Sequence, residues 1–175
     1  MKKKIFAISG STRKNASSNL LINYIREINQ DNFDIIEYPS IELLPHFNPD
    51  LEQTALPSEV VEFRKLIEEA DGVLICTPEY IFSLPGSLKN ALEWTVATIV
   101  FDSKPTALIV ASALGEHAFQ ELLLIMKTMS ANYKEDTTML ISGIRSKFDE
   151  NSELKDAVLK EKLMLLSNNF KKLMD

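Results

Sequence analysis

The chain has 175 residues, with 19 basic and 25 acidic side chains, which give a formal net charge of −6. This length fits one domain, residues 1–175, that can bury a sizeable core. The acidic balance argues against a protein that binds nucleic-acid backbones, because such proteins carry a basic face. No run of about 18 apolar residues occurs, so no membrane-spanning helix is expected. Cys76 is the only cysteine, which excludes an internal disulfide and fits a cytoplasmic protein.

Short apolar runs of β type alternate with segments of helical period along the chain. In order, we expect a strand over 4–9, a helix over 17–30, a strand over 33–38, an irregular segment over 39–56, a helix over 57–70, a strand over 73–77, a helix over 84–100, a strand over 106–112, a helix over 117–130, a strand over 137–141 and a helix over 153–173. Such alternation predicts a parallel sheet covered by helices on both faces. With right-handed crossovers, these elements give a flavodoxin-like α/β three-layer sandwich, a doubly wound five-stranded sheet with the expected strand order 2-1-3-4-5.

Polar residues fill the loop between the first expected strand and the first helix, which reads Ser9-Gly10-Ser11-Thr12-Arg13-Lys14-Asn15-Ala16-Ser17-Ser18-Asn19. Small hydroxyl groups, backbone N–H groups, a guanidinium and a helix N-terminus together suit a phosphate group. The same residues could instead form a Ser-rich N-cap beside a solvated Arg13. The position directly after the first strand favours the phosphate. The fingerprints Gly-x-Gly-x-x-Gly and Gly-x-x-x-x-Gly-Lys-Ser/Thr are absent, which argues against a Rossmann dinucleotide site or a P-loop.

A second loop of interest follows the third expected strand, where the apolar run Val73–Cys76 stops at Thr77-Pro78-Glu79-Tyr80. In the order 2-1-3-4-5, strands one and three flank the point at which this fold class binds a flavin mononucleotide. Pro78-Glu79-Tyr80 taken alone could be an ordinary turn with a surface tyrosine. Because this segment is expected opposite a loop that suits phosphate, Pro78-Glu79-Tyr80 is also a candidate to line the flat ring of a flavin.

Two segments resemble the NADPH-dependent FMN reductase family, which includes quinone, chromate and azo-dye reductases. They are Gly10-Ser11-Thr12-Arg13 with Ser17-Ser18-Asn19, and Thr77-Pro78-Glu79-Tyr80 with Ser83-Leu84-Pro85-Gly86-Ser87-Leu88-Lys89-Asn90-Ala91 and Trp94. The resemblance implies an enzyme with FMN and NADPH as cofactors. Hydride would pass from NADPH to flavin N5, and electrons would then pass to a small-molecule acceptor such as a flavin, quinone, chromate or azo compound. The alternative is a non-enzymatic flavin-binding electron carrier of the same fold.

The resemblance also implies which residues bind the cofactor. Around the FMN phosphate it places Ser9, Ser11, Arg13, Ser17, Ser18 and Asn19. Along the isoalloxazine and ribityl chain it places Pro78, Glu79, Tyr80 and Ser83. Thr12, Ile81 and Ser112 complete the expected cofactor-binding set. No side chain need act as acid or base in the first step, since the cofactor supplies the chemistry. The family likeness also implies a homodimer or homotetramer.

Three features depart from the usual family pattern. Ile81 stands where many members carry Asn, which removes one polar contact. Leu114 lies in the loop after the fourth strand, where many members carry a Gly-Gly-type sequence, and its side chain is expected to crowd the ring. The phosphate loop is one residue longer between Arg13 and Asn19. Ile81 and Leu114 support a third interpretation, a fold relative that has lost FMN.

Four further residues are candidates for chemistry or contact. Cys76, in an expected buried strand, is favoured as a small core residue over a reactive thiol. His46 and His117 lack acidic or cysteine partners at ligand spacing, so no metal site is expected. Trp94 falls outside the apolar stripe of its helix and could be a second packing face, a subunit contact or a flavin neighbour, of which we favour the subunit contact.

Overall fold

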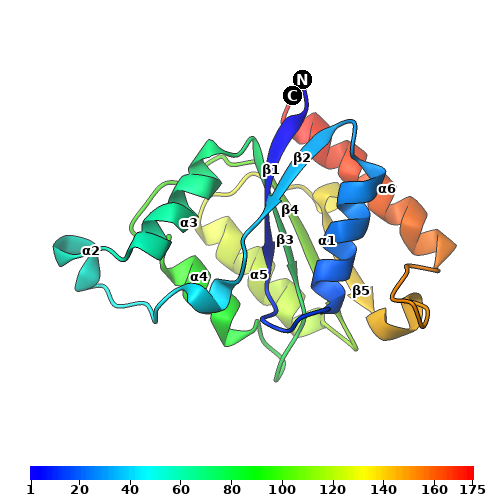
Figure 1. The fold of residues 1–175 in the computed structure, drawn as a ribbon, viewed down its shortest axis with the longest axis horizontal. Helices are drawn as coiled ribbons and strands as arrows, with labels where there is room; N and C mark the ends of the chain where they lie inside the picture. Colours follow the sequence, from blue (N-terminus) through cyan, green and yellow to red (C-terminus); the bar gives the residue numbers. More distant parts are fainter.

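The computed structural model describes all 175 residues and contains one five-stranded parallel sheet in the order β2-β1-β3-β4-β5 (Figure 1). The strands are β1 (Lys3–Ser9), β2 (Phe33–Glu37), β3 (Gly72–Thr77), β4 (Thr106–Ser112) and β5 (Thr138–Ser142). Their register pairs Ile5 with both Ile35 and Gly72, and Val110 with Leu140. The expected strand order and the flavodoxin-like α/β class are therefore confirmed.

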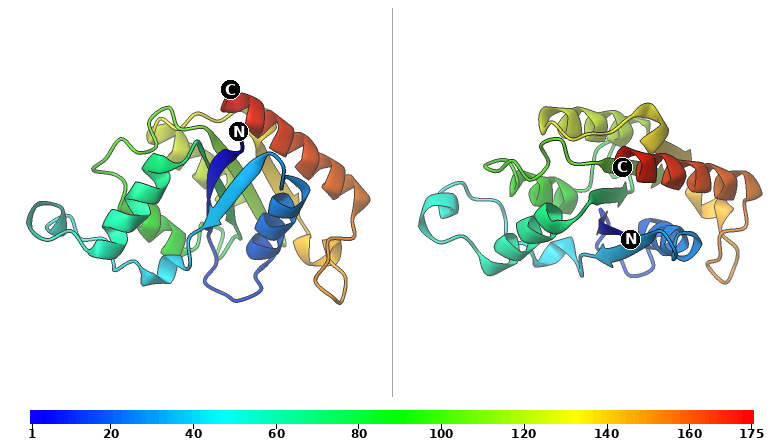
Figure 2. Two further views of the ribbon diagram at one scale, coloured as in Figure 1. Left: turned by 45° about the horizontal axis from the view of Figure 1, so that its top comes forward. Right: turned by 90° about the horizontal axis from the view of Figure 1, so that it is seen from above.

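Helices cover both faces of the sheet. One face carries α1 (Ser17–Ile28) and α6 (Ala157–Leu173), and the other carries α3 (Ser58–Glu69), α4 (Gly86–Glu93) and α5 (Glu116–Thr128). In the right-hand view of Figure 2, α3 and α4 lie to the left of the sheet and α1 and α6 to the right. Shorter turns are η1 (Ile41–Leu43), α2 (Leu51–Thr54), η2 (Glu135–Thr137) and η3 (Ile144–Lys147). None of the helices combines the length and apolar character needed to cross a bilayer.

Alternation along the strands divides the buried side chains into two cores. In β1, Ile5 and Ala7 pack towards α1 and α6, while Phe6 and Ile8 pack towards α3 and α4. Every residue of β3 is buried because helices cover both faces of this central strand. The period of two along a strand therefore divides each apolar run between the two layers.

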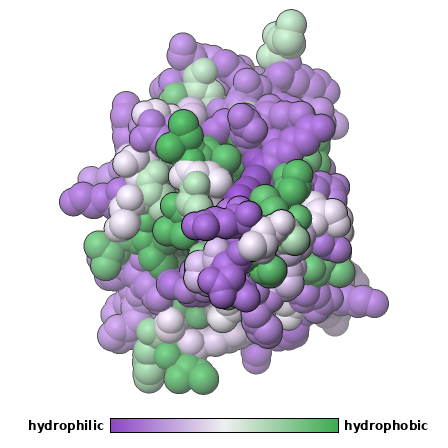
Figure 3. Space-filling model, turned by 90° about the vertical axis from the view of Figure 1, so that its left-hand side faces the viewer, coloured by the Kyte–Doolittle hydropathy of each residue, from purple (hydrophilic) through white to green (hydrophobic).

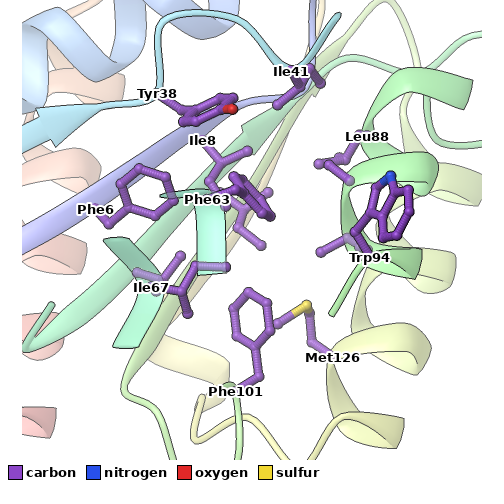
Figure 4. Close-up of a cluster of buried hydrophobic side chains, with 14 of the residues drawn as sticks. Phe6, Ile8, Tyr38, Ile41, Phe63, Ile67, Leu88, Trp94, Phe101 and Met126 are labelled. Carbon is purple, nitrogen blue, oxygen red and sulfur yellow. The ribbon is translucent and has the colours of Figure 1, made fainter. Parts of the chain in front are cut away.

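The irregular segment 39–56 is held by two residues of the α4 region. The Asn90 side-chain amide donates to the carbonyl of Pro45 (3.0 Å), and its oxygen accepts from the N–H of Phe47 (2.7 Å). The Trp94 indole N–H donates to the same Pro45 carbonyl (2.7 Å), and its ring lies edge-on to Phe47. Trp94 is fully buried, and Figure 4 shows it among the side chains of the larger core. The expected subunit contact is therefore wrong, and Trp94 forms a second packing face.

The helix expected over 84–100 is shorter, because α4 ends at Glu93. Beyond it, the backbone N–H groups of Thr95 and Val96 bond three residues back rather than four. The Thr95 hydroxyl also donates to the carbonyl of Leu92 (2.8 Å). Bonds of this tighter kind and β-branched residues both weaken a helix end. Val96 and Ile99, apolar residues within the helix expected over 84–100, are 68% and 84% exposed.

Replacing Asn90 with Ala should lower the free energy of unfolding by about 2 to 3 kcal/mol, because two hydrogen bonds to the 39–56 segment are lost and their partners stay covered. Urea unfolding followed by circular dichroism measures this change. The control is Lys89→Ala on the same helix, which removes only an exposed pair with Glu93 and should cost less than about 0.5 kcal/mol. Equal losses for the two variants would contradict the anchoring role.

Candidate functional site

A cavity of about 780 Å³ opens at the carboxyl ends of the strands. Four segments form its walls: the β1–α1 loop, the β3–α4 loop, the end of β4 and the turn from β5 into η3. In Figure 1 these segments lie along the lower edge of the sheet. Parallel strands end at a common edge, so loops far apart in the sequence meet there, at the place where open α/β sheets bind ligands.

The β1–α1 loop gives the cavity a wall suited to an anion. Ser11, Arg13, Ser17 and Ser18 line it. Helix α1 begins at Ser17, its N-cap is Ala16, no side chain caps it, and its first turn holds no acidic residue. The first N–H groups of an α-helix lack partners within the helix and carry a partial positive charge. Hydroxyl groups, these N–H groups and one guanidinium form a donor set that fits a phosphate.

Ser9 and Asn19 lie behind this wall and do not line the cavity. The Ser9 hydroxyl lies 2.8 Å from the Ser18 hydroxyl and donates to the Asn19 side-chain oxygen (2.9 Å). The Asn19 amide donates in turn to Glu37 at the end of β2 (3.2 Å), and Glu37 also pairs with Arg26 of α1. The two residues therefore hold the β1–α1 loop against the sheet. Thr12 is exposed and also lies outside the cavity lining.

The β3–α4 loop contributes Pro78, Glu79 and Tyr80 to the opposite wall. The Glu79 carboxylate accepts hydrogen bonds from the N–H groups of Gly115 (3.2 Å) and Ala118 (3.0 Å). Since α5 begins at Glu116, Glu79 supplies the cap that the start of this helix needs. The Ser112 hydroxyl, which also lines the cavity, donates to the Glu79 carbonyl (3.5 Å). Glu79 thus joins the β3–α4 loop to the β4–α5 loop.

A second carboxylate, that of Glu121 on α5, holds the other end of the β3–α4 loop. It accepts hydrogen bonds from the Ser83 hydroxyl (2.7 Å) and from the N–H of Leu84 (2.9 Å). Ser83 therefore points towards α5 and does not line the cavity. At the near end, the Tyr80 hydroxyl lies 3.5 Å from the Ser11 hydroxyl and links the two walls.

Ile81 and Phe82 form the tip of a tight turn that projects from this loop. Tyr80 and Ser83 exchange two backbone hydrogen bonds, and the φ angles of Ile81 and Phe82 are 53° and 54°. A two-residue turn with both angles positive normally carries Asn, Asp or Gly, because β-branched and bulky residues are strained there. Ile81 is 96% exposed and lies outside the cavity lining. Asn, which many members of the resembled family carry here, tolerates this backbone conformation.

The structure places two further residues away from the cavity. Leu114, whose side chain was expected to crowd the ring, is 62% exposed and does not line the cavity. The His117 ring lies edge-on to the ring of Phe82, with 5.2 Å between ring centroids. No group of three or more His, Cys, Asp or Glu side chains is arranged to hold a metal ion.

Sequence reasoning missed the wall contributed by the end of β5. Its lining residues are Gly143, Ile144, Arg145, Ser146 and Phe148. The run Ser142-Gly143-Ile144-Arg145-Ser146 resembles the β1–α1 loop in composition, with hydroxyls, a glycine and an arginine directly after a strand. This similarity in composition could have identified the turn after β5 as part of the site. Other lining residues that were missed are Asn15, Ala16, Leu20, Ala111 and Ala113.

The strand order and the two loops that face one another across its switch point define a flavodoxin-like α/β protein with a cavity at the carboxyl ends of its strands. The family model for NADPH-dependent FMN reductases matches residues 3–143. The chain therefore belongs to the NADPH-dependent FMN reductase family. Family membership confirms the prediction of an oxidoreductase with FMN and NAD(P)H as cofactors.

Relatives of known name support this assignment. The chain is 33% identical over 168 residues to the NAD(P)H:quinone oxidoreductase of Solanum tuberosum, covering 91% of this chain and 87% of that protein. It is 31% identical over 184 residues to the NADH-dependent flavin reductase subunit 2 of Lactobacillus johnsonii, covering 98% and 97%. The solved structure of FerB, a flavoenzyme NAD(P)H:(acceptor) oxidoreductase from Paracoccus denitrificans, superposes with a TM-score of 0.78 at 22% identity and covers 98% of this chain and 97% of that one. This last likeness supports the fold.

Replacing Ile81 with Asn should raise the free energy of unfolding by about 1 kcal/mol, because Asn relieves strain at the positive φ angle. Thermal unfolding measures the gain. The control is Ile99→Asn, another exposed isoleucine whose φ angle is not positive, and it should leave stability within about 0.5 kcal/mol. A gain of the same size in both variants would show that replacing an exposed apolar side chain with a polar one, and not relief of backbone strain, raises the stability.

Burial raises the pKa of the Cys76 thiol far above its usual range, and the charge of Glu37 adds to the effect. Since the thiolate is the reactive form, folded protein at pH 8 should resist iodoacetamide, and urea-unfolded protein should be alkylated rapidly. Mass spectrometry reports both results. Rapid alkylation of the folded protein would contradict the assignment of Cys76 as a core residue.

Proposed function

We propose that the protein is an FMN-dependent oxidoreductase that passes hydride from NADPH to bound FMN and then electrons to a small acceptor such as a flavin, quinone, chromate or azo compound. The observation that carries this proposal is the cavity wall formed by the uncapped start of α1 together with Arg13. It supplies donors without protein acceptors at the position where this fold class holds a flavin phosphate.

In this proposal the β1–α1 loop holds the FMN phosphate. Ser11 and Ser17 would donate through their hydroxyls, and the first turn of α1, which includes Ser18, through its N–H groups. Arg13 would supply a two-pronged, charge-assisted contact. Ser9 and Asn19 would act indirectly, because their hydrogen bonds reach Ser18 and Glu37 and fix the loop in place.

The isoalloxazine would lie between the β3–α4 loop and the end of β4. Pro78 and Tyr80 offer apolar surface on one side, and Ala111, Ser112 and Ala113 line the other. The Glu79 carboxylate accepts hydrogen bonds from two N–H groups at the α5 start, so its part is to position the β3–α4 loop. FMN supplies the hydride and electron chemistry when bound, and the protein's part is to bind, orient and limit access by water.

Features of the chain outside the cavity complete the proposal. We propose that residues 1–175 act as a single FMN-binding domain, since one sheet and its two cores run through the chain. Exposed Val96 and Ile99 beyond α4, and exposed Ile81 and Phe82 beside the cavity, support a homodimer or homotetramer. On the face shown in Figure 3, apolar side chains lie in separate groups among hydrophilic ones. A cytoplasmic location is compatible with the single, buried Cys76.

A non-enzymatic electron carrier is the second candidate, because an archaeal flavodoxin superposes with a TM-score of 0.66 at 14% identity. Quinone and flavin reductase names among closer relatives favour the enzyme and, as acceptors, quinones and flavins. Stopped-flow mixing of FMN-loaded protein with NADPH separates the two functions. An enzyme bleaches the flavin absorbance within its turnover time, whereas a carrier is reduced far more slowly. Steady-state rates with a quinone, chromate, an azo dye and free FMN then rank the acceptors.

Replacing Arg13 with Ala should weaken FMN binding about tenfold to a hundredfold and leave riboflavin binding nearly unchanged, because only FMN carries the phosphate. Quenching of flavin fluorescence measures both dissociation constants. The control is Lys14→Ala, which removes the neighbouring exposed cation that does not line the cavity. Equal losses for FMN and riboflavin would contradict the phosphate assignment, and wild-type protein that binds neither would refute the proposed function.

A further inference from the structure

Arg145 is a second arginine that lines the cavity without a protein partner. The chain has four arginines. Arg26 pairs with Glu37, and Arg64 pairs with Glu52. Arg13 and Arg145 make no ion pair and no side-chain hydrogen bond, and both line the same cavity. An unpaired arginine on an open surface is ordinarily solvated. Arg13 and Arg145 are both exposed, but both are lining residues of one concave site.

The charges around this cavity differ in sign from those of the whole chain. The protein carries a net charge of −6, yet the charged lining residues are Arg13, Arg145 and Glu79. The Glu79 carboxylate already accepts two hydrogen bonds from the start of α5. Two free cations therefore face a space whose only carboxylate is engaged. A concave site lined by one sign of charge attracts ligands of the opposite sign.

The turn that carries Arg145 is well fixed. Gly143 adopts a left-handed conformation with φ of 65°, and its N–H donates to the carbonyl of Ala113 (3.1 Å). The Ser146 hydroxyl closes the turn by donating to the Gly143 carbonyl (2.8 Å). Ile144 is buried in the core beneath α1 and α6. With both neighbours held, only the long side chain of Arg145 remains free to adjust to a ligand.

Arg145 and Arg13 enter the cavity from different strands of the sheet. Arg13 follows β1 and Arg145 follows β5, and β3 and β4 lie between these two strands. Three strand spacings of about 4.8 Å separate them, a span of about 14 Å. The β1–α1 loop already combines one guanidinium with the partial positive charge of a helix start, which suits one phosphate. A second guanidinium on another wall points to a second anionic group.

We propose that Arg145 forms a second phosphate-binding subsite at the β5 end of the cavity and that it binds a phosphate of the pyridine nucleotide. The inference rests on the proposed function, since FMN has a single phosphate whereas NADPH has a pyrophosphate and a 2′-phosphate. Arg145 is thus a residue for nucleotide affinity and not a catalytic residue. Its planar guanidinium can contact two oxygens of one phosphate group.

The test compares Arg145→Gln with wild type in direct binding assays. Isothermal titration calorimetry with adenosine 2′,5′-bisphosphate and with ADP is carried out on protein with and without FMN. We expect the affinity for adenosine 2′,5′-bisphosphate to fall about tenfold to a hundredfold, as loss of a charge-assisted hydrogen bond predicts. FMN affinity should change less than about twofold, and the KM for NADPH should rise with kcat retained. Lys162→Gln on the exposed face of α6 is the matched control for lost charge.

Each outcome supports or overturns the proposal. A loss for adenosine 2′,5′-bisphosphate alone assigns Arg145 to the 2′-phosphate, and an equal loss for ADP assigns it to the pyrophosphate. Weaker FMN binding with unchanged binding of both probes overturns it, because Arg145 then serves the flavin phosphate. It is also overturned if Arg145→Gln behaves like Lys162→Gln, or if wild type binds neither probe. Failure of the proposed function is distinct, since it appears as absent FMN binding while the probes still report on Arg145.

Discussion

The hydrogen bonds from the start of α5 to the Glu79 carboxylate set the arrangement on which the site depends. They fix the β3–α4 loop against the β4–α5 loop, and Glu121 holds the far end of the same loop. They also satisfy the start of α5, one of the helix starts at this edge of the sheet. The start of α1, capped by no side chain, keeps N–H groups of the kind that suit an anion. One carboxylate therefore shapes the wall formed by the β3–α4 loop, while the uncapped start of α1 belongs to the opposite wall.

Charge is distributed so that an acidic protein keeps a positive cavity. Carboxylates pair with Arg26 and Arg64, while Arg13 and Arg145 remain available at the ligand edge. An uncapped helix start is less stable than a capped one, and a ligand that binds there replaces the missing cap. Ligand binding and stability of the fold are thereby linked, since a ligand that binds only the folded state stabilises it. The buried Ser9–Ser18–Asn19 contacts keep the loop in place for that ligand.

Several features could be predicted because they depend on local pattern. Apolar runs and helical periods located all five strands, and their alternation implied a parallel sheet. The loops after β1 and β3 were found because hydroxyls, Arg13 and the Pro78-Glu79-Tyr80 turn directly follow strands. The length of α4 was not predicted correctly, because apolar Val96 and Ile99 continue the helical period of the sequence although the α-helix ends at Glu93. The role of Trp94 was missed because its partner Pro45 lies 49 residues away.

The sequence by itself determined the fold class, the edge of the sheet at which the cavity opens and the family, because each depends on short-range patterns and motifs. Only the tertiary structure decided what individual side chains face. In the folded chain, Glu79 and Ser83 bond to α5, and Ile81 is exposed to solvent. Arg145, which follows the last strand, lines the same cavity as the loop after the first strand. The physical reason is that these roles depend on hydrogen bonds and packing between elements far apart in sequence, which no local period encodes.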